Sequence, residues 1–215
     1  EYFNNDIHFV MKVTKTLNMF LFSEKECHNL RNELSNKRKL SVDNDNDNEI
    51  NANNKNDNLF EKLFYLWSFN PFTAVLLTMY CNYFELSYYL ALELSKIKLQ
   101  ENDYIELCQI VQIFESSLFN NIRIKLLRPK KNIFLVKTLY ALLMMLPQSN
   151  AFDALNNRSK SVKIISYFDE DEDEDDFLYE NKNIKNEEIS QINKKIIIEK
   201  YVNILKERYQ KKIES

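Results

Sequence analysis

Apolar residues at three- and four-residue steps recur along most of the chain and predict helices. Within residues 6–22, Val10, Val13 and Leu17 have the spacing that places side chains on one face of a helix. We therefore expect residues 1–40 to begin with a helix and to form a helical hairpin.

The end of this first helix is marked by polar residues. Ser23 followed by Glu26 has the pattern of a capping box, which predicts a break and a second helix over about 24–40. Residues 41–58, rich in Asn and Asp, have almost no apolar surface to bury, so we expect a disordered insertion there.

Residues 59–165 are expected to form a helical C-terminal domain. Asn70-Pro71 supplies an N-cap and a proline at the first helical position, Asp103 is placed to cap another helix, and Pro129 separates two more. Short helices with tight polar turns favour an all-α fold of stacked helical hairpins, a HEAT-like α-solenoid, although no fixed repeat period is visible. The predicted helices lie at about 71–81, 83–97, 103–116, 118–127, 132–146 and 149–160.

Two segments of different composition follow residue 165. Residues 166–186 contain the acidic run DEDEDEDD, whose favoured interpretation is a solvated, disordered linker. Residues 187–215 carry a stripe at helical spacing and predict a long amphipathic helix, docked on its own domain or paired with a partner helix; the stripe comprises Ile198, Val202, Leu205, Tyr209 and Ile213.

The apolar run Leu139–Leu146 raises the question of a membrane span. A span needs about 20 apolar residues, whereas this run is shorter, ends at Pro147 and is preceded by Lys137. Because it is apolar on all faces, we expect it to be the central, most buried helix of the domain, with Ser149 capping the next helix.

Composition excludes several classes of protein. The chain contains no glycine, so Gly-rich phosphate loops and GxSxG elbows are absent, and an all-β fold is disfavoured. The net charge of −3 includes the eight acids of Asp169–Asp176, so the remainder is net basic, but its basic residues are scattered rather than interleaved with aromatics. We expect no nucleic-acid partner.

Catalytic and metal-binding residues are sparse. Cys27, Cys81 and Cys108 are far apart and without CxxC spacing, which indicates small buried thiols in a reducing compartment. Neither His8 nor His28 joins a ligand cluster, and adjacent Cys27 and His28 would point about 100° apart on a helix. We expect no enzyme activity, no catalytic residue, no metal and no cofactor. The amino terminus shows no signal peptide, and no transmembrane segment is seen.

Two groups of residues are candidates for contact with partners. Aromatic surplus near a predicted helix junction suits a protein interface, although part of it must belong to the core. Basic residues around the turn near 128–131 would suit an anionic membrane surface or an acidic partner, or form a solvated edge. The candidate partner-facing residues are Tyr83, Tyr88, Tyr89, Arg123, Lys130, Lys131, Tyr201, Leu205 and Tyr209.

The segment LYALLMMLPQSNAFDAL, which begins at Leu139, closely resembles the C-terminal sequence pattern of the Vac-fourteen family, roughly LYGLLMLLPQSxAFxxL. Other segments are also similar to the family: Trp67 with Asn70-Pro71 after two intervening residues, the stretch Phe119–Lys137, the helical pair Leu17–Leu34 and, more weakly, YVNILKERYQKKI. Ala141 stands where the family tends to have glycine. The residues that carry the resemblance, as packing or interface positions, are Trp67, Asn70, Pro71, Leu139, Tyr140, Leu142, Leu143, Leu146, Pro147, Gln148, Ser149, Ala151 and Phe152.

This resemblance implies a non-catalytic scaffold that follows the end of a helical-repeat array. Family members bind a FYVE-type phosphatidylinositol 3-phosphate 5-kinase and a Sac-type phosphoinositide phosphatase. Their C-terminal domain self-associates as a homo-oligomer and holds the phosphatase. The implied location is the cytosolic face of endosome and vacuole or lysosome membranes, with peripheral association through the complex. The alternative is a HEAT- or armadillo-type helical adaptor in another trafficking or transport complex.

Overall fold

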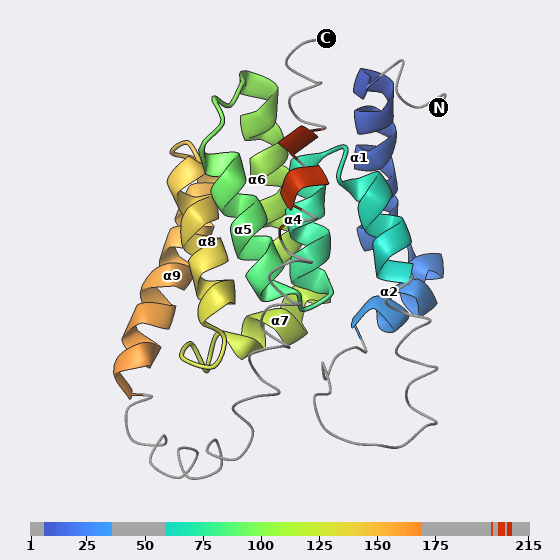
Figure 1. The fold of residues 1–215 in the computed structure, drawn as a ribbon. Coiled ribbons are helices and arrows are strands. Elements are labelled where there is room, and N and C mark those ends of the chain that lie inside the picture. The colour runs from blue at the N-terminus through green and yellow to red at the C-terminus, as the bar shows by residue number, and fades with distance from the viewer. Residues whose placement is uncertain (1–6, 36–58, 169–198, 200–201, 205, 208–215) are drawn as a thin grey trace, which may run out of the picture. The chain divides into compact units, whose positions relative to one another are not determined.

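The computed structural model describes residues 7–35, 59–168, 199, 202–204 and 206–207 (Figure 1). Across these residues the secondary structure is helical, with no strand, which confirms the all-α prediction. The chain divides into two compact units, residues 1–83 with 204–215 and residues 84–203. Among the residues described, no helix is long and apolar enough to cross a membrane.

The first unit begins with two helices joined by a 3-10 turn. It contains α1 (Ile7–Ser23), the 3-10 helix η2 (Lys25–Cys27), α2 (His28–Ser35), a helix over residues 59–67, and α4 (Pro71–Tyr80). Trp67 donates its indole N–H to the Asn18 side chain at 3.0 Å, both buried, so the helix at 59–67 is fixed to α1. Because both polar groups are paired, their burial carries little penalty.

A buried arginine fixes the corner between α1 and α2. The Arg31 guanidinium donates to the carbonyls of Leu21 and Glu24, each at 2.7 Å, at the place where α1 ends and η2 begins. The last carbonyls of a helix lack partners within it, so this cation satisfies acceptors that would otherwise need water.

The capping box expected at Ser23 is wrong. Ser23 is the last residue of α1, and its hydroxyl donates backward to the Met19 carbonyl at 2.7 Å. Glu24 takes the N-cap position of η2 without a side-chain hydrogen bond. A serine at a helix boundary can bond in either direction, and the sequence pattern does not distinguish them.

The start of α4 confirms the Asn70-Pro71 prediction. The Asn70 side-chain oxygen accepts from the backbone N–H groups of Phe72 at 3.1 Å and Thr73 at 3.3 Å, and Pro71 is the first helical residue. After α4, the chain turns at Asn82, which has a φ of 62°. Asparagine tolerates this left-handed conformation better than other non-glycine residues, and here it serves in a chain that has no glycine.

Every residue of α4 is buried, and this corrects one expectation. The run Leu139–Leu146 was expected to be the most buried helix, yet Tyr140 and Met144 within it are exposed, Met144 to 87%. Both segments are apolar all round, so periodicity does not rank them by depth. Burial follows from what surrounds each helix.

The second unit stacks helices in pairs. It contains α5 (Phe84–Ser95), α6 (Glu101–Glu115), η3 (Ser117–Phe119), α7 (Asn120–Lys125), α8 (Ile133–Met145) and α9 (Asn150–Phe168). Helix α5 packs on α8, α6 packs on α9, and α8 contacts α9 (Figure 1). Successive pairs that contact their neighbours in this way are the arrangement of a helical solenoid.

Of the two N-caps predicted in this unit, the one at α6 is wrong and the one at α9 is confirmed. Asp103 does not occupy the N-cap of α6; Gln100 does, and the Asp103 carboxylate accepts from the Gln100 backbone N–H at 2.9 Å from the third helical position. Ser149 acts as predicted, because its hydroxyl oxygen accepts from the Phe152 N–H at 3.3 Å at the start of α9.

Several predicted segments lie outside the described residues. These include the insertion at 41–58 and the linker at 166–186 beyond residue 168. The predicted C-terminal helix over 187–215 is described only at residues 199, 202–204 and 206–207, which are helical.

Candidate interaction surface

The residues that carry the family resemblance are mainly packing residues. Around α4, the indole of Trp67 and the Asn70 cap are buried with their hydrogen-bonding groups satisfied. In α8 and α9 the set divides by depth: Leu139, Leu142, Leu146 and Ala151 are buried, Leu143, Ser149 and Phe152 are half-buried, and Tyr140, Pro147 and Gln148 are exposed. These residues mainly hold the unit together, and Tyr140 is the large side chain among them that reaches the surface.

A stripe of exposed side chains follows one side of α8. Ile133, Lys137, Tyr140 and Met144 recur at steps of four, three and four residues, which places them on one helix face. Ile133 is 45% exposed and Tyr140 38%. We call these four residues the α8 face. Ile133 and Met144 were not singled out from the sequence, because a helix that is apolar on all sides offers no pattern for choosing its exposed side.

Aromatic residues of α5 border the α8 face. The Tyr88 ring lies 6.0 Å from the Phe134 ring and 5.4 Å from the Tyr89 ring, measured between centroids. The Lys137 ammonium lies 5.7 Å from the Tyr88 ring and 5.3 Å from the Phe134 ring. Tilted ring pairs, with a cation over two of the rings, hold these side chains against one another.

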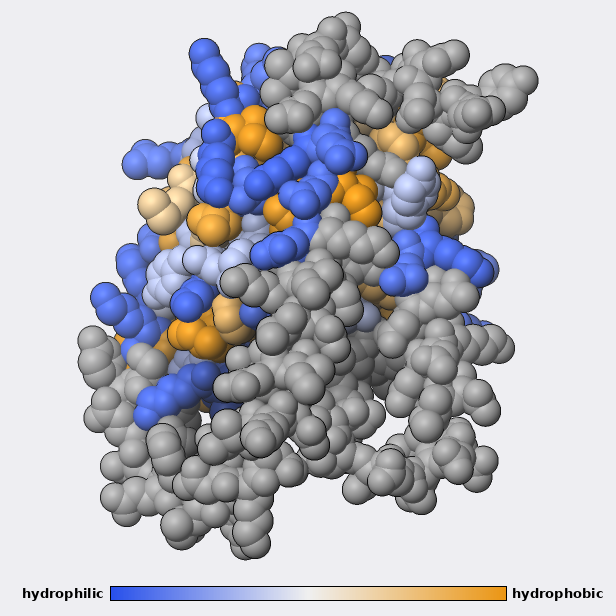
Figure 2. Space-filling view, viewed as in Figure 1, coloured by the Kyte–Doolittle hydropathy of each residue, from blue (hydrophilic) through white to orange (hydrophobic). Residues whose placement is uncertain are grey.

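A buried polar contact sets the register of α5 against α8 beneath this surface. The hydroxyls of Ser87 and Thr138 lie 3.1 Å apart and are buried; one donates to the other, and the accepting hydroxyl donates to a carbonyl of its own helix. At the other side of α8, the Tyr140 hydroxyl donates to the Ser159 carbonyl of α9 at 3.5 Å. The α8 face is therefore supported from both neighbouring helices. Figure 2 shows hydrophobic patches between hydrophilic side chains on the face turned toward the viewer.

Exposed apolar residues also line α1 in the first unit. Phe9 is 59% exposed and Phe20 57%, with Leu17 between them in sequence and also exposed. Their spacing of eight and three residues keeps them on one side of the helix. We call Phe9, Leu17 and Phe20 the α1 face. Three large exposed apolar residues on one side of a helix make this side a candidate interaction site.

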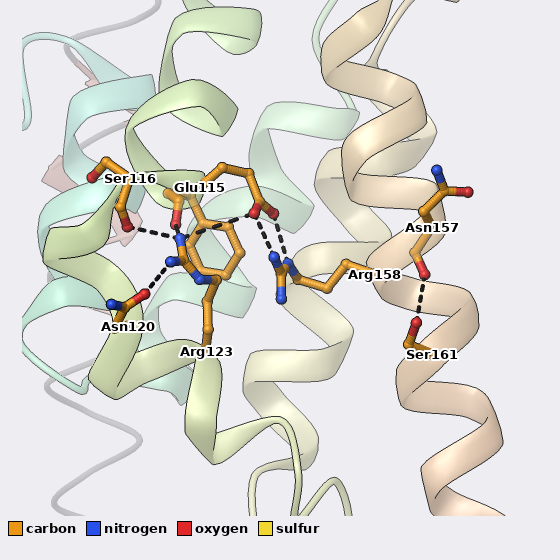
Figure 3. Close-up of polar contacts among 8 residues, drawn as sticks. Glu115, Ser116, Asn120, Arg123, Asn157, Arg158 and Ser161 are labelled. Carbon is orange, nitrogen blue, oxygen red and sulfur yellow. Dashed lines mark hydrogen bonds and ion pairs between the residues drawn. The ribbon is translucent and has the colours of Figure 1, made fainter.

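Arg123 does not face a partner as expected. Its guanidinium donates to the carbonyls of Phe114 at 2.6 Å and Ser116 at 2.7 Å, and to the Asn120 side chain (Figure 3). Glu115 lies 3.9 Å from the same group. Burial lowers the pKa of Arg123, and the nearby Glu115 carboxylate opposes that shift. This arginine holds the end of α6 against α7.

Glu115 also joins α6 to α9. Its carboxylate accepts two hydrogen bonds from Arg158, the one to Nε at 2.6 Å, in a two-pronged arrangement (Figure 3). A planar guanidinium that meets both carboxylate oxygens gives directional as well as electrostatic stabilisation. The charged residues of this region therefore serve the architecture.

The other candidate partner-facing residues are placed as follows. Tyr83 is half-buried and packs on Phe60 with ring centroids 4.2 Å apart, whereas Tyr89 is exposed. Lys130 and Lys131 are exposed on the turn between α7 and α8. Tyr201, Leu205 and Tyr209 lie outside the described residues.

Chemical groups for catalysis are few in the part of the chain that the structure describes. That part contains no group of three or more His, Cys, Asp or Glu residues able to hold a metal. Cys27, Cys81 and Cys108 are free thiols, Cys81 buried and the other two half-buried. The Cys108 sulfur lies 3.7 Å from the Ser149 hydroxyl, between α6 and the start of α9.

An all-α fold of stacked hairpins, with large apolar side chains exposed on single helix faces, defines a helical binding domain. The chain belongs to the family described as the Vacuolar protein 14 C-terminal domain that binds the Fig-four protein, which matches residues 2–162. The family resemblance seen in the sequence is thereby confirmed.

Relatives in three organisms agree with this assignment. The chain is 31% identical over 160 residues to the Vacuole morphology and inheritance protein 14 of Saccharomyces cerevisiae, and 30% over 146 residues to the VAC14 homolog of Schizosaccharomyces pombe. It is 27% identical over 164 residues to the VAC14 homolog of Arabidopsis thaliana. These matches cover 68–76% of this chain but only 16–20% of the relatives. No solved structure matches the chain.

Proposed function

We propose that the chain is a non-catalytic scaffold domain that binds a Sac-type phosphoinositide phosphatase of the Fig-four kind. Membership of a family described by binding of the Fig-four protein supports the partner. The observation that carries the proposal is the α8 face, where Met144 is 87% exposed beside Tyr140 on a rigid helix. The Tyr140 side chain is tied to α9 through its hydroxyl, and a side chain held in this way binds with little loss of conformational freedom.

We assign the α8 face to the contact with the phosphatase. Its centre is apolar and aromatic, and Lys137 lies within it over two rings. Interfaces are enriched in aromatic residues and Met at their centres and are polar at their rims. Tyr88 and Tyr89 on α5 extend the same surface.

A binding experiment with matched variants tests this assignment. The chain is immobilised and the affinity of the purified phosphatase is measured for the wild type and for Tyr140→Ser/Met144→Ser. Loss of two central contacts is expected to weaken binding roughly tenfold to 100-fold. Ile105→Ser, at a site on α6 that is 51% exposed, is the control and should bind as the wild type does. Full affinity in the double variant would remove the α8 face from the proposal, and no binding by the wild type would refute the proposal itself.

We also propose that the domain self-associates and supports a complex with the phosphatidylinositol 3-phosphate 5-kinase at the cytosolic face of endosome and vacuole membranes. The α1 face supports this part, because a scaffold with several partners needs more than one exposed apolar surface. Light scattering should give a mass above one chain for the wild type and one chain for Phe9→Ser/Phe20→Ser. A strictly monomeric wild type would exclude self-association. Capture of the kinase from a mixture of purified subunits tests the remaining partner.

A further inference from the structure

The turn between α7 and α8 combines exposed aliphatic and basic side chains. Ile124 is 61% exposed and Leu127 56%, and Ile133 follows at the start of α8. Arg128, Lys130 and Lys131 are exposed in the same segment. We call Ile124, Leu127, Arg128, Lys130 and Lys131 the basic turn, which Ile133 of the α8 face adjoins; it lies at the end of the unit where α7 meets α8 (Figure 1).

The charge around the basic turn is one-sided. Between Glu115 and Asp153 the sequence contains no acidic residue and six basic ones. Helix α9 runs back along α8, so Lys160 and Lys163, beyond the Tyr140–Ser159 contact, lie toward the same end of the unit. The first turn of α5 contributes the half-buried Glu85. Among the described residues this end is positive, and the acidic run Asp169–Asp176 that follows α9 lies outside them.

The basic turn is held in a fixed shape from within. The Asn132 side chain donates to the carbonyls of Lys125 at 3.0 Å and Arg128 at 3.1 Å, and Pro129 and Leu126 are buried beneath. Lys125 packs its ammonium 5.1 Å from the Phe84 ring, and burial lowers its pKa. Since the interior side of the segment is anchored, its aliphatic and basic side chains are presented outward together.

We propose that the basic turn docks on an anionic membrane surface, with Ile124 and Leu127 entering the interface and the lysines and Arg128 meeting lipid phosphates. Charge complementarity selects an anionic partner. The two aliphatic side chains select a bilayer over an acidic peptide, because a peptide of carboxylates offers them no apolar environment, whereas the acyl boundary does. This contact is direct and needs neither the phosphatase nor the kinase.

Sedimentation with vesicles tests the proposal on the whole chain. The probe vesicles are phosphatidylcholine alone and phosphatidylcholine with phosphatidylserine. Each basic residue near an anionic bilayer contributes roughly fivefold in affinity, so Arg128→Gln/Lys130→Gln/Lys131→Gln should lose roughly 100-fold. A matched variant, Lys12→Gln/Lys25→Gln/Lys62→Gln, removes the same charge from exposed positions of the first unit and should lose little.

A variant of the aliphatic residues distinguishes insertion into a bilayer from attraction by charge alone. Ile124→Ser/Leu127→Ser keeps the charge and should weaken vesicle binding roughly tenfold. Both residues are exposed, so the variant should fold, and a circular dichroism spectrum equal to the wild type's checks this. Binding should also weaken as salt is raised.

Four results would overturn the proposal. One is equal sedimentation with neutral and anionic vesicles. The second is an equal loss in the two charge variants, which would mean attraction by net charge alone. The third is an unchanged affinity in Ile124→Ser/Leu127→Ser. The fourth is tight binding of a polyglutamate peptide without vesicle binding, which would identify an acidic protein as the partner. Because the vesicle assay contains no phosphatase, its outcome does not depend on whether the proposed function is correct.

Discussion

Replacing Arg123 with methionine is expected to loosen the junction of α6 and α7. The guanidinium donates at 2.6 and 2.7 Å to two carbonyls, those of Phe114 and Ser116. A hydrogen bond to a charged group contributes about 1.5–3 kcal/mol, so the pair contributes at most about 3–6 kcal/mol. Methionine keeps the apolar stem of the side chain and removes the donors.

Two features reduce this value. The Ser116 carbonyl retains a second donor, the Phe119 N–H at 3.2 Å, and the burial that lowers the pKa of Arg123 means that the cation itself is held at some desolvation cost. The 3.9 Å approach of half-exposed Glu115 adds little after solvent screening. The expected loss in the free energy of unfolding is therefore about 2–4 kcal/mol.

Two measurements report the loss of stability. Urea unfolding followed by circular dichroism gives the change in the free energy of unfolding of the whole chain. Hydrogen exchange gives the local change at the junction of α6 and α7, which is needed because the chain has two compact units. Amides of α7 and of the end of α6 should exchange roughly 30- to 800-fold faster, corresponding to about 2–4 kcal/mol. Lys160→Met, at an exposed position of α9, should change stability by less than about 0.5 kcal/mol. A variant of Arg123 no less stable than this control would refute the reasoning.

Three further predictions concern other parts of the fold. Asn70→Ala removes the N-cap of α4 and should cost about 1 kcal/mol in urea unfolding, with Asn70→Asp close to the wild type; equal losses in both would show that capping is not the cause. Leu139→Ala, at a 2% exposed position, should cost about 2–5 kcal/mol, whereas Met144→Ala on the same helix should cost less than about 0.5 kcal/mol, and similar losses would contradict the placement of the α8 face. Burial raises the pKa of the Tyr80 hydroxyl above 10.0, so the folded state holds that proton longer and stability falls as pH rises from 10.0 through the raised value; Tyr80→Phe should remove this part of the alkaline loss in urea unfolding, and identical pH profiles would refute it.

Local chemistry explains what the sequence predicts well. The start of α4 follows from Asn70 and Pro71, and the start of α9 from Ser149, because an N-cap requires only neighbours along the chain. Where two local solutions compete, the prediction is wrong. Ser23 bonds back to Met19, and Asp103 supports a cap instead of providing it.

Three-dimensional context explains the rest. α4 and α8 are both apolar all round, and only their surroundings decide that α4 is buried while α8 exposes Tyr140 and Met144. Arg123 reads as a surface cation beside other basic residues, yet its partners are carbonyls seven and nine residues earlier that a turn of the chain brings into reach. A binding face defined by exposure is a property of packing, so Ile133 and Met144 could not be chosen from the sequence alone.

Arg31 and Arg123 occupy equivalent places in the chain. Each is the fourth residue of a short helix that follows a 3-10 turn, and each donates back to carbonyls at the end of the preceding long helix. The surrounding sequences share residues at the same spacing: Phe22, Asn29, Arg31 and Leu34 correspond to Phe114, Asn121, Arg123 and Leu126.

This elbow appears twice, once in each compact unit, with different neighbours around it. Its angle is set by an internal cation that saturates the free carbonyls of one helix, so it does not depend on a flexible hinge residue. A chain without glycine can in this way change direction sharply at a rigid joint. The same joint, an arginine bonded to carbonyls at the end of the preceding helix, is thus built at two places in the chain with few matching residues around it.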